Sequence, residues 1–229
     1  MLACVYLLAM SPDPLPWPLT GLGAADRQRA LRFRRPEDQA SFVAGRRLLD
    51  RLVEDQVGGR RLPLAIGAYG RPGLTGPGSE RIDVNISHCD GLVAAAVCSS
   101  GRIGVDVESA ARPIDVAGLA RRYFLESEVV AIAAAAESER SRAFLRYWTA
   151  KEAALKAIGR GLLIPLDQVS IDADFSALRF APALGEDAAT WRLLTRDFGT
   201  HVLAVAVSGA EASTAELRER WLTRADLGV

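Results

Sequence analysis

Two runs of alanine and valine constrain the fold of this chain more than any other feature of its sequence. The runs are GLVAAAVCS at residues 91–99 and HVLAVAVSG at residues 201–209, and both have the composition of buried strands. In each case, helical segments that carry basic residues come earlier in the same half of the chain. This repeated order indicates a duplicated α+β unit, with a ligand expected between the two halves.

Length and composition agree with such an arrangement. The chain has 229 residues, of which 49% are hydrophobic, so it has enough apolar material for a core. We expect an N-terminal half at residues 1–108 and a C-terminal half at 109–229, which together form one compact unit with the active site between them. The 28 basic and 28 acidic residues cancel, which argues against a global field that would attract nucleic acid or an anionic membrane.

The cysteines and the start of the chain indicate a cytoplasmic protein. Cys4, Cys89 and Cys98 are an odd number without metal-ligand spacing, so we expect neither disulfides nor a cysteine metal site. The apolar start is too short to span a bilayer and leads into a proline-rich turn at residues 11–18, so we interpret it as a first strand.

The remaining pattern predicts alternating groups of helices and strands. In the first half we expect two helices, a short strand with a glycine-proline turn, and an antiparallel meander of three strands, at residues 20–33, 36–56, 64–74 and 81–109. In the second half we expect helices over residues 110–159, then four strands, and a short amphipathic helix at 214–229.

Glu152 stands out because it falls on an apolar helix face. On a helix through RYWTAKEAALKAIG, at about 100° per residue, Glu152 lies among Leu145, Trp148 and Leu155. An unpaired buried charge costs several kcal/mol at least, so Glu152 needs a protein cation, a metal ion or a polar ligand. The alternative is a surface pair with Lys156, four residues further on.

IGVDVES, at residues 103–109, contains two acids that would point the same way from a strand. Asp106 and Glu108 would lie about 7 Å apart beside Gly104, on the face opposite the apolar residues. Two such carboxylates with Glu152 as a third suit Mg²⁺, which takes a few carboxylates, water and substrate phosphate. The alternative is a strand with a solvated acidic face.

Other candidates are individually ordinary. Ser87 and His88, in NISHCDG, are typical of a polar turn, and Arg46, Arg47 and Arg71 are typical of solvated surface cations. Together, however, the arginines supply what a polyphosphate ligand needs, because a guanidinium donates two hydrogen bonds at once to phosphate oxygens.

The combination of motifs resembles the 4'-phosphopantetheinyl transferase superfamily. IGVDVE and, about forty residues later, WTAKEAALKAIGRG match the paired signature G-[IV]-D-[IV]-E and W-x-x-K-E-[AS]-x-x-K, while GRRLL, YGRPGL and NISH occur upstream in the expected order. The length and the duplication resemble the surfactin-synthetase-activating (Sfp-type) class, a monomer with two pseudo-twofold α+β halves, each an antiparallel sheet packed with helices.

The resemblance implies transfer of the phosphopantetheine arm of coenzyme A to a serine of an apo acyl or peptidyl carrier protein, with release of 3',5'-ADP. The resemblance also implies a role in polyketide and nonribosomal peptide biosynthesis. By motif, the metal ligands for Mg²⁺ would be Asp106, Glu108 and Glu152, and the catalytic residues would be Glu152, Asp106 and Lys156. The residues that contact coenzyme A would be Arg46, Arg71, Ser87, His88, Asp106, Glu152 and Lys156.

Within this set, Arg46 would hold the 3'-phosphate, Arg71 the adenine region, Ser87 and His88 the nucleotide phosphates, and Lys156 a phosphate. Glu152 is a metal ligand and also a candidate general base for the attacking serine, and the sequence does not separate these roles. Cys89 is a weak candidate nucleophile because no activating base accompanies it.

Two other functions remain as alternatives. Another Mg²⁺-dependent phosphate-handling enzyme, such as a nucleotide hydrolase, is disfavoured because no P-loop motif occurs. A non-catalytic α+β binding module would leave Glu152 unexplained. For the transferase, we also expect Arg121, Arg122, Tyr123 and Phe124 near the carrier-docking groove, unless the two aromatic residues belong to the core.

Overall fold

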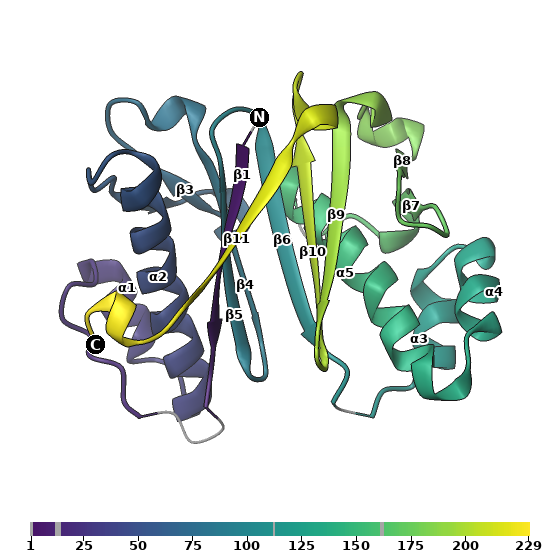
Figure 1. Cartoon of the computed structure of the whole chain (residues 1–229), viewed down its shortest axis with the longest axis horizontal. Coiled ribbons are helices and arrows are strands. Elements are labelled where there is room, and N and C mark those ends of the chain that lie inside the picture. The colour runs from purple at the N-terminus through teal and green to yellow at the C-terminus, as the bar shows by residue number, and fades with distance from the viewer. Residues whose placement is uncertain (1, 12–14, 112, 161–162) are drawn as a thin grey trace.

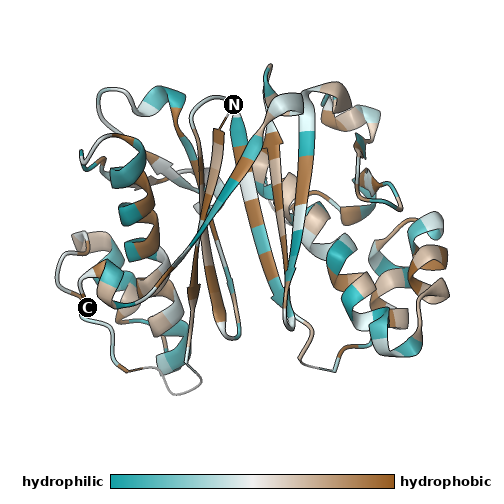
Figure 2. Ribbon diagram, in the orientation of Figure 1, coloured by the Kyte–Doolittle hydropathy of each residue, from teal (hydrophilic) through white to brown (hydrophobic). Residues whose placement is uncertain are grey.

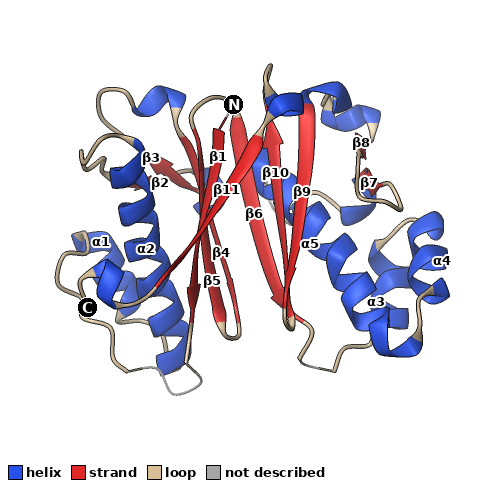
Figure 3. Cartoon of the chain, viewed as in Figure 1, coloured by secondary structure: helices blue, strands red, loops and turns tan. Residues whose placement is uncertain are grey.

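Two β-sheets pack face to face at the centre of the molecule, and helices cover their outer faces (Figures 1 and 3). The structure is a computed structural model that describes residues 2–11, 15–111, 113–160 and 163–229. Three residues of the predicted turn at 11–18 therefore lie outside the described residues. The order of layers is helix, sheet, sheet, helix, so the fold is α+β with two related halves, as predicted.

The first sheet has four strands in the order β11-β1-β5-β4. Its strands are β1 (Leu2–Ala9), β4 (Asp83–Cys89), β5 (Leu92–Cys98) and β11 (Glu216–Leu222). β1 and β4 are antiparallel to β5, and β11 is parallel to β1. β1 and β11 are far apart in the sequence, and their pairing brings segments near both ends of the chain into one sheet.

The second sheet has three antiparallel strands in the order β6-β10-β9. They are β6 (Arg102–Ser109), β9 (Trp191–Phe198) and β10 (His201–Ser208). Two small antiparallel pairs lie outside the main sheets: β2 (Leu64–Ile66) with β3 (Pro72–Leu74), and β7 (Val169–Ile171) with β8 (Leu178–Phe180).

Each sheet is covered by one long helix. α2 (Pro36–Gln56) packs on the first sheet beside α1 (Ala24–Ala30), and α5 (Arg140–Ile158) packs on the second beside α3 (Val116–Tyr123) and α4 (Glu126–Ala134). α2 begins at Pro36, whose missing N–H costs nothing at a first helical position. α5 ends at Gly159, which has the left-handed φ of 87° that favours glycine.

Three apolar clusters fill the spaces between these layers. One lies between the sheets and includes Val5, Ala94, Val105 and Val205, all without solvent exposure. The other two lie under α2 and under α5. Figure 2 shows the central strands as predominantly hydrophobic, which explains why alanine and valine dominate both runs: side chains on both faces of β5 and β10 are buried.

The predicted three-stranded meander is wrong at its third strand. β5 already has β4 on one edge and β1 on the other, so β6 cannot hydrogen-bond to it and pairs with β10 instead. The division predicted between residues 108 and 109 thus falls at the end of β6, while β6 itself belongs to the sheet of the second half.

Polar side chains join the two sheets where β4 lies beside β6. The backbone N–H groups of Ile103, Val105 and Val107 donate to Asp83 Oδ2 at 2.7 Å, Asn85 Oδ1 at 3.2 Å and Ser87 Oγ at 3.4 Å respectively. Alternate side chains of β4 therefore replace the backbone ladder that a sheet neighbour would provide.

The helix predicted at residues 214–229 is also wrong. Residues Glu216–Leu222 form β11, which Figure 1 shows crossing from the second half to lie along β1. β5 pairs with one edge of β1, and β11 pairs with the other. The backbone hydrogen bonds to this second edge favour a strand over the helix that the spacing of Leu217, Trp221 and Leu222 predicts. Among the helices that the structure describes, none is long and apolar enough to cross a membrane.

Candidate active site

The site forms where β6 and α5 are in backbone contact. A Cβ atom added at Gly104 would lie 1.9 Å from the Ala153 carbonyl oxygen and 2.6 Å from the Ala157 nitrogen, so this position accepts glycine alone. The alternation predicted for β6 is confirmed: Val105 and Val107 enter the core between the sheets, and Gly104 and Asp106 face α5. The contact brings Asp106 to the side of the helix that carries Glu152 and Lys156.

Asp106 is buried, with 4% of its surface exposed, which contradicts a solvated acidic face at this position. Its Oδ1 accepts from Lys156 Nζ at 2.6 Å and from Ser87 Oγ at 2.9 Å. Its Oδ2 is buried and has no hydrogen-bond partner among the described residues. One oxygen is therefore held by the protein and the other is left for a ligand.

Lys156 connects the two halves of the site. Its Nζ donates to Asp106 Oδ1, to Ser87 Oγ at 3.0 Å and to the Val105 carbonyl at 3.2 Å. The surface pair of Lys156 with Glu152 is therefore not the arrangement found, because the ammonium group lies on Asp106. Ser87 comes from β4, so residues from both halves meet here.

Glu152 is 7% exposed, as its place on the apolar helix face predicted. Its Oε1 is buried and accepts no hydrogen bond from the residues that the structure describes. Burial, and then the negative charge of Asp106, raise the pKa of Glu152 from 4.5 to about 7, while Lys156 lowers it. Among the described residues, Lys156 is the cation that favours the ionised form of Glu152, and burial and Asp106 outweigh it.

Glu108 lies at the more open end of the same acidic group. Burial, and then the negative charges of Asp106 and Glu152, raise its pKa from 4.5 to about 7 against the opposing effect of Lys156. Glu108 and Glu152 thus affect one another electrostatically, which places all three predicted acids in one cluster. At neutral pH this cluster would be more stable with a cation beside it.

A cavity of about 320 Å³ opens beside Glu152 and Lys156. Its lining residues come from α5, β4 and the YGRP segment, and they include Tyr69, Arg71, Asn85 and Gly159. Tyr69 is 71% exposed and has a positive φ of 61°, which is uncommon for a residue other than glycine. The end of the WTAKEAALKAIGRGL motif is described at Gly159 and Arg160, and Gly161 and Leu162 lie outside the described residues.

Arg71 lines this cavity, but its guanidinium also binds the protein. Nη1 donates to the Ala157 carbonyl at 2.7 Å, and Nη2 donates to Asp83 Oδ2 at 2.5 Å and to the Ile103 carbonyl at 3.0 Å. Arg71 therefore joins the C-terminal end of α5 to both β4 and β6. Its side chain has the additional role of a clamp between the halves, which the sequence did not predict.

His88 lies on the other side of the acidic cluster, in a groove of about 610 Å³ between the halves. Cys89, Asp90 and His201 line the same groove. Burial, with the negative charges of Glu108, Asp106 and Asp90, raises the pKa of Cys89 to about 12, so its thiol stays protonated at neutral pH. This environment argues against a nucleophilic role for Cys89.

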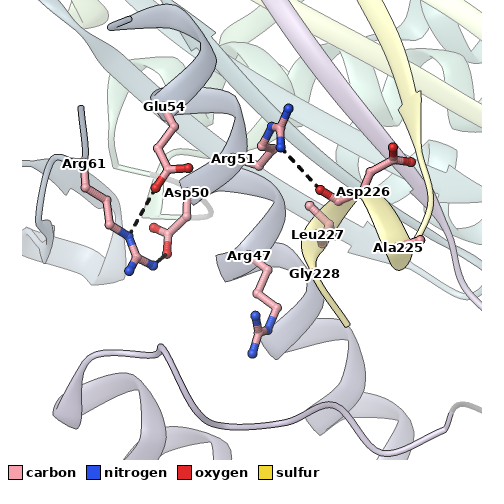
Figure 4. Close-up of a pocket in the computed structure, with 9 residues that line it drawn as sticks. All are labelled: Arg47, Asp50, Arg51, Glu54, Arg61, Ala225, Asp226, Leu227 and Gly228. Atoms are coloured by element: carbon pink, nitrogen blue, oxygen red, sulfur yellow. Dashed lines mark hydrogen bonds and ion pairs between the residues drawn. The ribbon is translucent and has the colours of Figure 1, made fainter. Parts of the chain in front are cut away.

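Arg46 and Arg47 do not contact the acidic cluster. Arg46 is 7% exposed, forms an ion pair with Asp26 at 3.1 Å and lies over the ring of Phe42. Arg47 lines a separate pocket of about 440 Å³ between α2 and the C-terminal residues, where Figure 4 shows Arg61 beside Asp50 and Glu54. Contact of Arg46 with a 3'-phosphate stays a prediction.

Phe124 is a core residue rather than part of an exposed docking surface. It is 7% exposed and stacks on Phe144, with ring centroids 5.0 Å apart. Tyr123 is half-buried and meets Trp148 edge-on, whereas Arg121 and Arg122 are exposed at the end of α3. For Phe124 the core alternative therefore holds, and a docking role of Arg121 and Arg122 stays a prediction.

The donor set fits a divalent cation, although the side chains are not arranged around one. Within the described residues, no group of three or more histidine, cysteine, aspartate and glutamate side chains has the arrangement of a metal site. The two unpartnered buried oxygens, Asp106 Oδ2 and Glu152 Oε1, are nevertheless the hard ligands that Mg²⁺ prefers. The residues present therefore fit the ion.

Asp83 and Asn85 were missed as site residues. Asn85 is 3% exposed, lines the cavity with Glu152 and binds the β6 backbone, and Asp83 holds Arg71. The signal was present in RIDVNISH: polar residues at positions 83, 85 and 87 alternate with apolar ones in a strand whose neighbours are buried.

Comparison with known proteins agrees with this geometry. Residues 102–206, which include both acidic motifs, match the model of the 4'-phosphopantetheinyl transferase superfamily. The chain is 32% identical to 4'-phosphopantetheinyl transferase HetI of Nostoc sp. over 82% of its own length and 79% of that protein.

Two relatives from Bacillus subtilis match less of the chain. The chain is 30% identical to 4'-phosphopantetheinyl transferase ffp, over 66% of each protein. It is 29% identical to 4'-phosphopantetheinyl transferase Sfp, over 63% of each protein. On these matches, and as its motifs predicted, the chain belongs to the 4'-phosphopantetheinyl transferase superfamily, in its Sfp-type class.

Proposed function

We propose that this transferase moves the phosphopantetheine arm of coenzyme A to a serine of an apo carrier protein with Mg²⁺ held by Asp106, Glu108 and Glu152. The observation that carries the proposal is the pair of buried, unpartnered oxygens, Asp106 Oδ2 and Glu152 Oε1, next to the Lys156 ammonium group and a cavity. Buried polar atoms normally have a hydrogen-bond partner, so this pair supports a site that water, an ion or a substrate completes.

In the proposed reaction, the serine oxygen forms a bond to the β-phosphorus of coenzyme A. The bond from that phosphorus to the bridging oxygen breaks, and 3',5'-ADP leaves with the bond's electron pair. Bound Mg²⁺ would supply positive charge to the pyrophosphate oxygens. The Lys156 ammonium group, held by Ser87 and Val105, would add a fixed positive charge in the cavity that Glu152 also lines.

Glu152, or a water molecule that it orients, takes the proton of the attacking serine. A general base needs to reach the proton it takes, and Glu152 lines the cavity that the serine would enter. Ser87 and His88 lie on β4, between the cavity and the groove, where they would meet the phosphates. Arg71 would contact the adenine region at the far side of the cavity.

The partner would be an acyl or peptidyl carrier protein of polyketide or nonribosomal peptide synthesis, in the cytoplasm. The site takes β4 from the first half and β6 and α5 from the second, so one chain supplies all of its parts. We therefore propose a monomer, with the halves 1–108 and 109–229 acting together. Light scattering after size exclusion would test this oligomeric state.

Mass spectrometry of apo carrier proteins tests the proposed transfer. With coenzyme A and Mg²⁺, a carrier should gain the mass of one phosphopantetheine, and an equal amount of 3',5'-ADP should appear. Chelation by EDTA should stop both, and added Mg²⁺ should restore them. Release of phosphate or a nucleoside monophosphate without any change in carrier mass would replace this proposal with the hydrolase alternative.

A further inference from the structure

The residue before Glu152 forms a fully buried ion pair of its own. Lys151 has no exposed surface, and its partner Glu128 is 2% exposed. Lys151 Nζ donates to Glu128 Oε2 at 2.7 Å, to the Leu166 carbonyl at 3.2 Å and to the Val169 carbonyl. These three acceptors use all the donors of the ammonium group, so none is left for a substrate.

Glu128 carries the connection to two other elements. Its Oε2 also accepts from the Leu125 backbone N–H at 3.0 Å, at the start of α4, and its Oε1 accepts from the Ile171 N–H at 3.0 Å, in β7. The Lys151–Glu128 pair therefore ties α5 to α4 and to β7, on a side of α5 away from β6. The ring of Phe124 lies 5.1 Å from Nζ and covers the pair.

Stability alone does not explain such a pair. Removing two charges from water often costs as much as their attraction returns, and well-packed apolar residues of similar size are commonly as stable. The pair instead restricts the orientation of α5, because the hydrogen bonds of both side chains go to fixed partners in α4, β7 and the segment before β7. A salt bridge with these constraints specifies one orientation of its helix.

That orientation bears directly on the active site. Glu152 follows Lys151 at about 100° around the helix, so any rotation of α5 moves both side chains together. On the β6 side, the contact at Gly104 fixes how closely α5 approaches the strand. The apolar packing under α5 also restrains the helix, and Lys151 adds a directional anchor to α4 and β7 next to Glu152.

We propose that Lys151 and Glu128 are positioning residues that fix the rotation of α5 and thereby hold Glu152 and Lys156 against Asp106. This inference rests on the proposed function of that site. Neither residue touches the substrate, and a shift of about 1 Å in a catalytic side chain can reduce a rate about 100-fold.

The double variant Lys151→Met/Glu128→Gln tests the proposal, because it removes the pair without leaving one charge buried alone. With the variant folded, as judged by circular dichroism and a cooperative thermal transition, we expect kcat to fall about 10- to 100-fold. The KM for coenzyme A should change less than about threefold, because the cavity residues remain in place. Mn²⁺ affinity, measured by electron paramagnetic resonance, should fall about tenfold.

Arg146→Gln is the matched control on the same helix. It removes the exposed ion pair of Arg146 with Asp197 at 2.5 Å, which ties α5 to β9, and should leave kcat and Mn²⁺ affinity unchanged. A folded double variant with wild-type kcat and wild-type Mn²⁺ affinity would overturn the proposal and make the pair purely structural. If the double variant does not fold, Glu128→Gln replaces it, because it removes the ion pair at unchanged side-chain size, with the same expected and overturning results.

Failure of the proposed function would look different. In that case the wild-type protein would transfer no phosphopantetheine to any carrier, whereas its Mn²⁺ affinity would still report the effect of the pair on Glu152.

Discussion

Replacing Glu152 with glutamine should stabilise the metal-free protein at alkaline pH and leave its stability unchanged at acidic pH. Burial and the charge of Asp106 raise the pKa of Glu152 from 4.5 to about 7 in the folded protein. A carboxyl group with a raised folded pKa binds its proton more tightly when folded. It therefore opposes folding once the unfolded chain ionises, from about pH 4.5 upward, and this penalty reaches its full value above about pH 7.

The pKa values set the size of this effect. The difference between 4.5 and about 7 corresponds to about 3 kcal/mol in the free energy of unfolding at pH 8. Because Glu108 shares the same cluster and titrates with Glu152, we expect glutamine to recover about 2 to 3 kcal/mol. For a chain of this size, that gain raises the melting temperature by about 4 to 12 °C.

Urea unfolding in EDTA at pH 4 and at pH 8 measures the effect. Glu137→Gln serves as the control, because Glu137 is exposed just before α5, and its variant should match the wild type at both pH values. Added Mg²⁺ should stabilise the wild-type protein more than Glu152→Gln. A gain of equal size at both pH values, or a loss of stability at pH 8, would refute the account of Glu152 as an unpaired buried carboxylate.

Three further outcomes follow from the geometry of the site. Gly104→Ala should lower kcat at least 100-fold in the carrier assay and destabilise the fold by about 1 to 3 kcal/mol, because the new Cβ meets the α5 backbone. Gly73→Ala is the control and should have neither effect, because a Cβ at that position meets no atom within 4 Å. Asp106→Asn should abolish detectable transfer, while Glu108→Gln, which alters the more open end of the cluster, should retain part of it in single-turnover measurements. Cys89→Ala should keep wild-type kcat at pH 7, because the pKa of the thiol is raised to about 12, and a loss of more than tenfold would return Cys89 to the list of catalytic candidates.

The sequence predicted the acidic cluster well because local periodicity determines it. Period-2 alternation in IGVDVES placed Asp106 and Glu108 on one face of a strand, and helical periodicity placed Glu152 on an apolar face, which the structure shows buried. Both signals depend on neighbouring residues alone. The same reasoning gave most of the helices and strands, including the two alanine and valine runs that became β5 and β10.

Features that depend on distant pairing were not predictable in this way. β11 has helical spacing, but it becomes a strand because the free edge of β1, more than 200 residues away in sequence, accepts it. The Lys151–Glu128 pair joins residues whose burial no local pattern indicates. Arg71 was predicted to bind a ligand, and its contacts with Asp83 and Ala157 became visible once β4 and α5 were side by side.

Binding of Mn²⁺ in the presence of coenzyme A tests the central claim most directly. Electron paramagnetic resonance titration of the wild-type protein should show one tightly bound Mn²⁺ per chain. Asp106→Asn or Glu152→Gln should each weaken Mn²⁺ binding at least tenfold, because each alters one of the two carboxylates that have an unpartnered buried oxygen. Wild-type affinity in both variants, or no bound Mn²⁺ in a wild-type protein that still modifies its carrier, would contradict the assignment of these carboxylates to a metal ion.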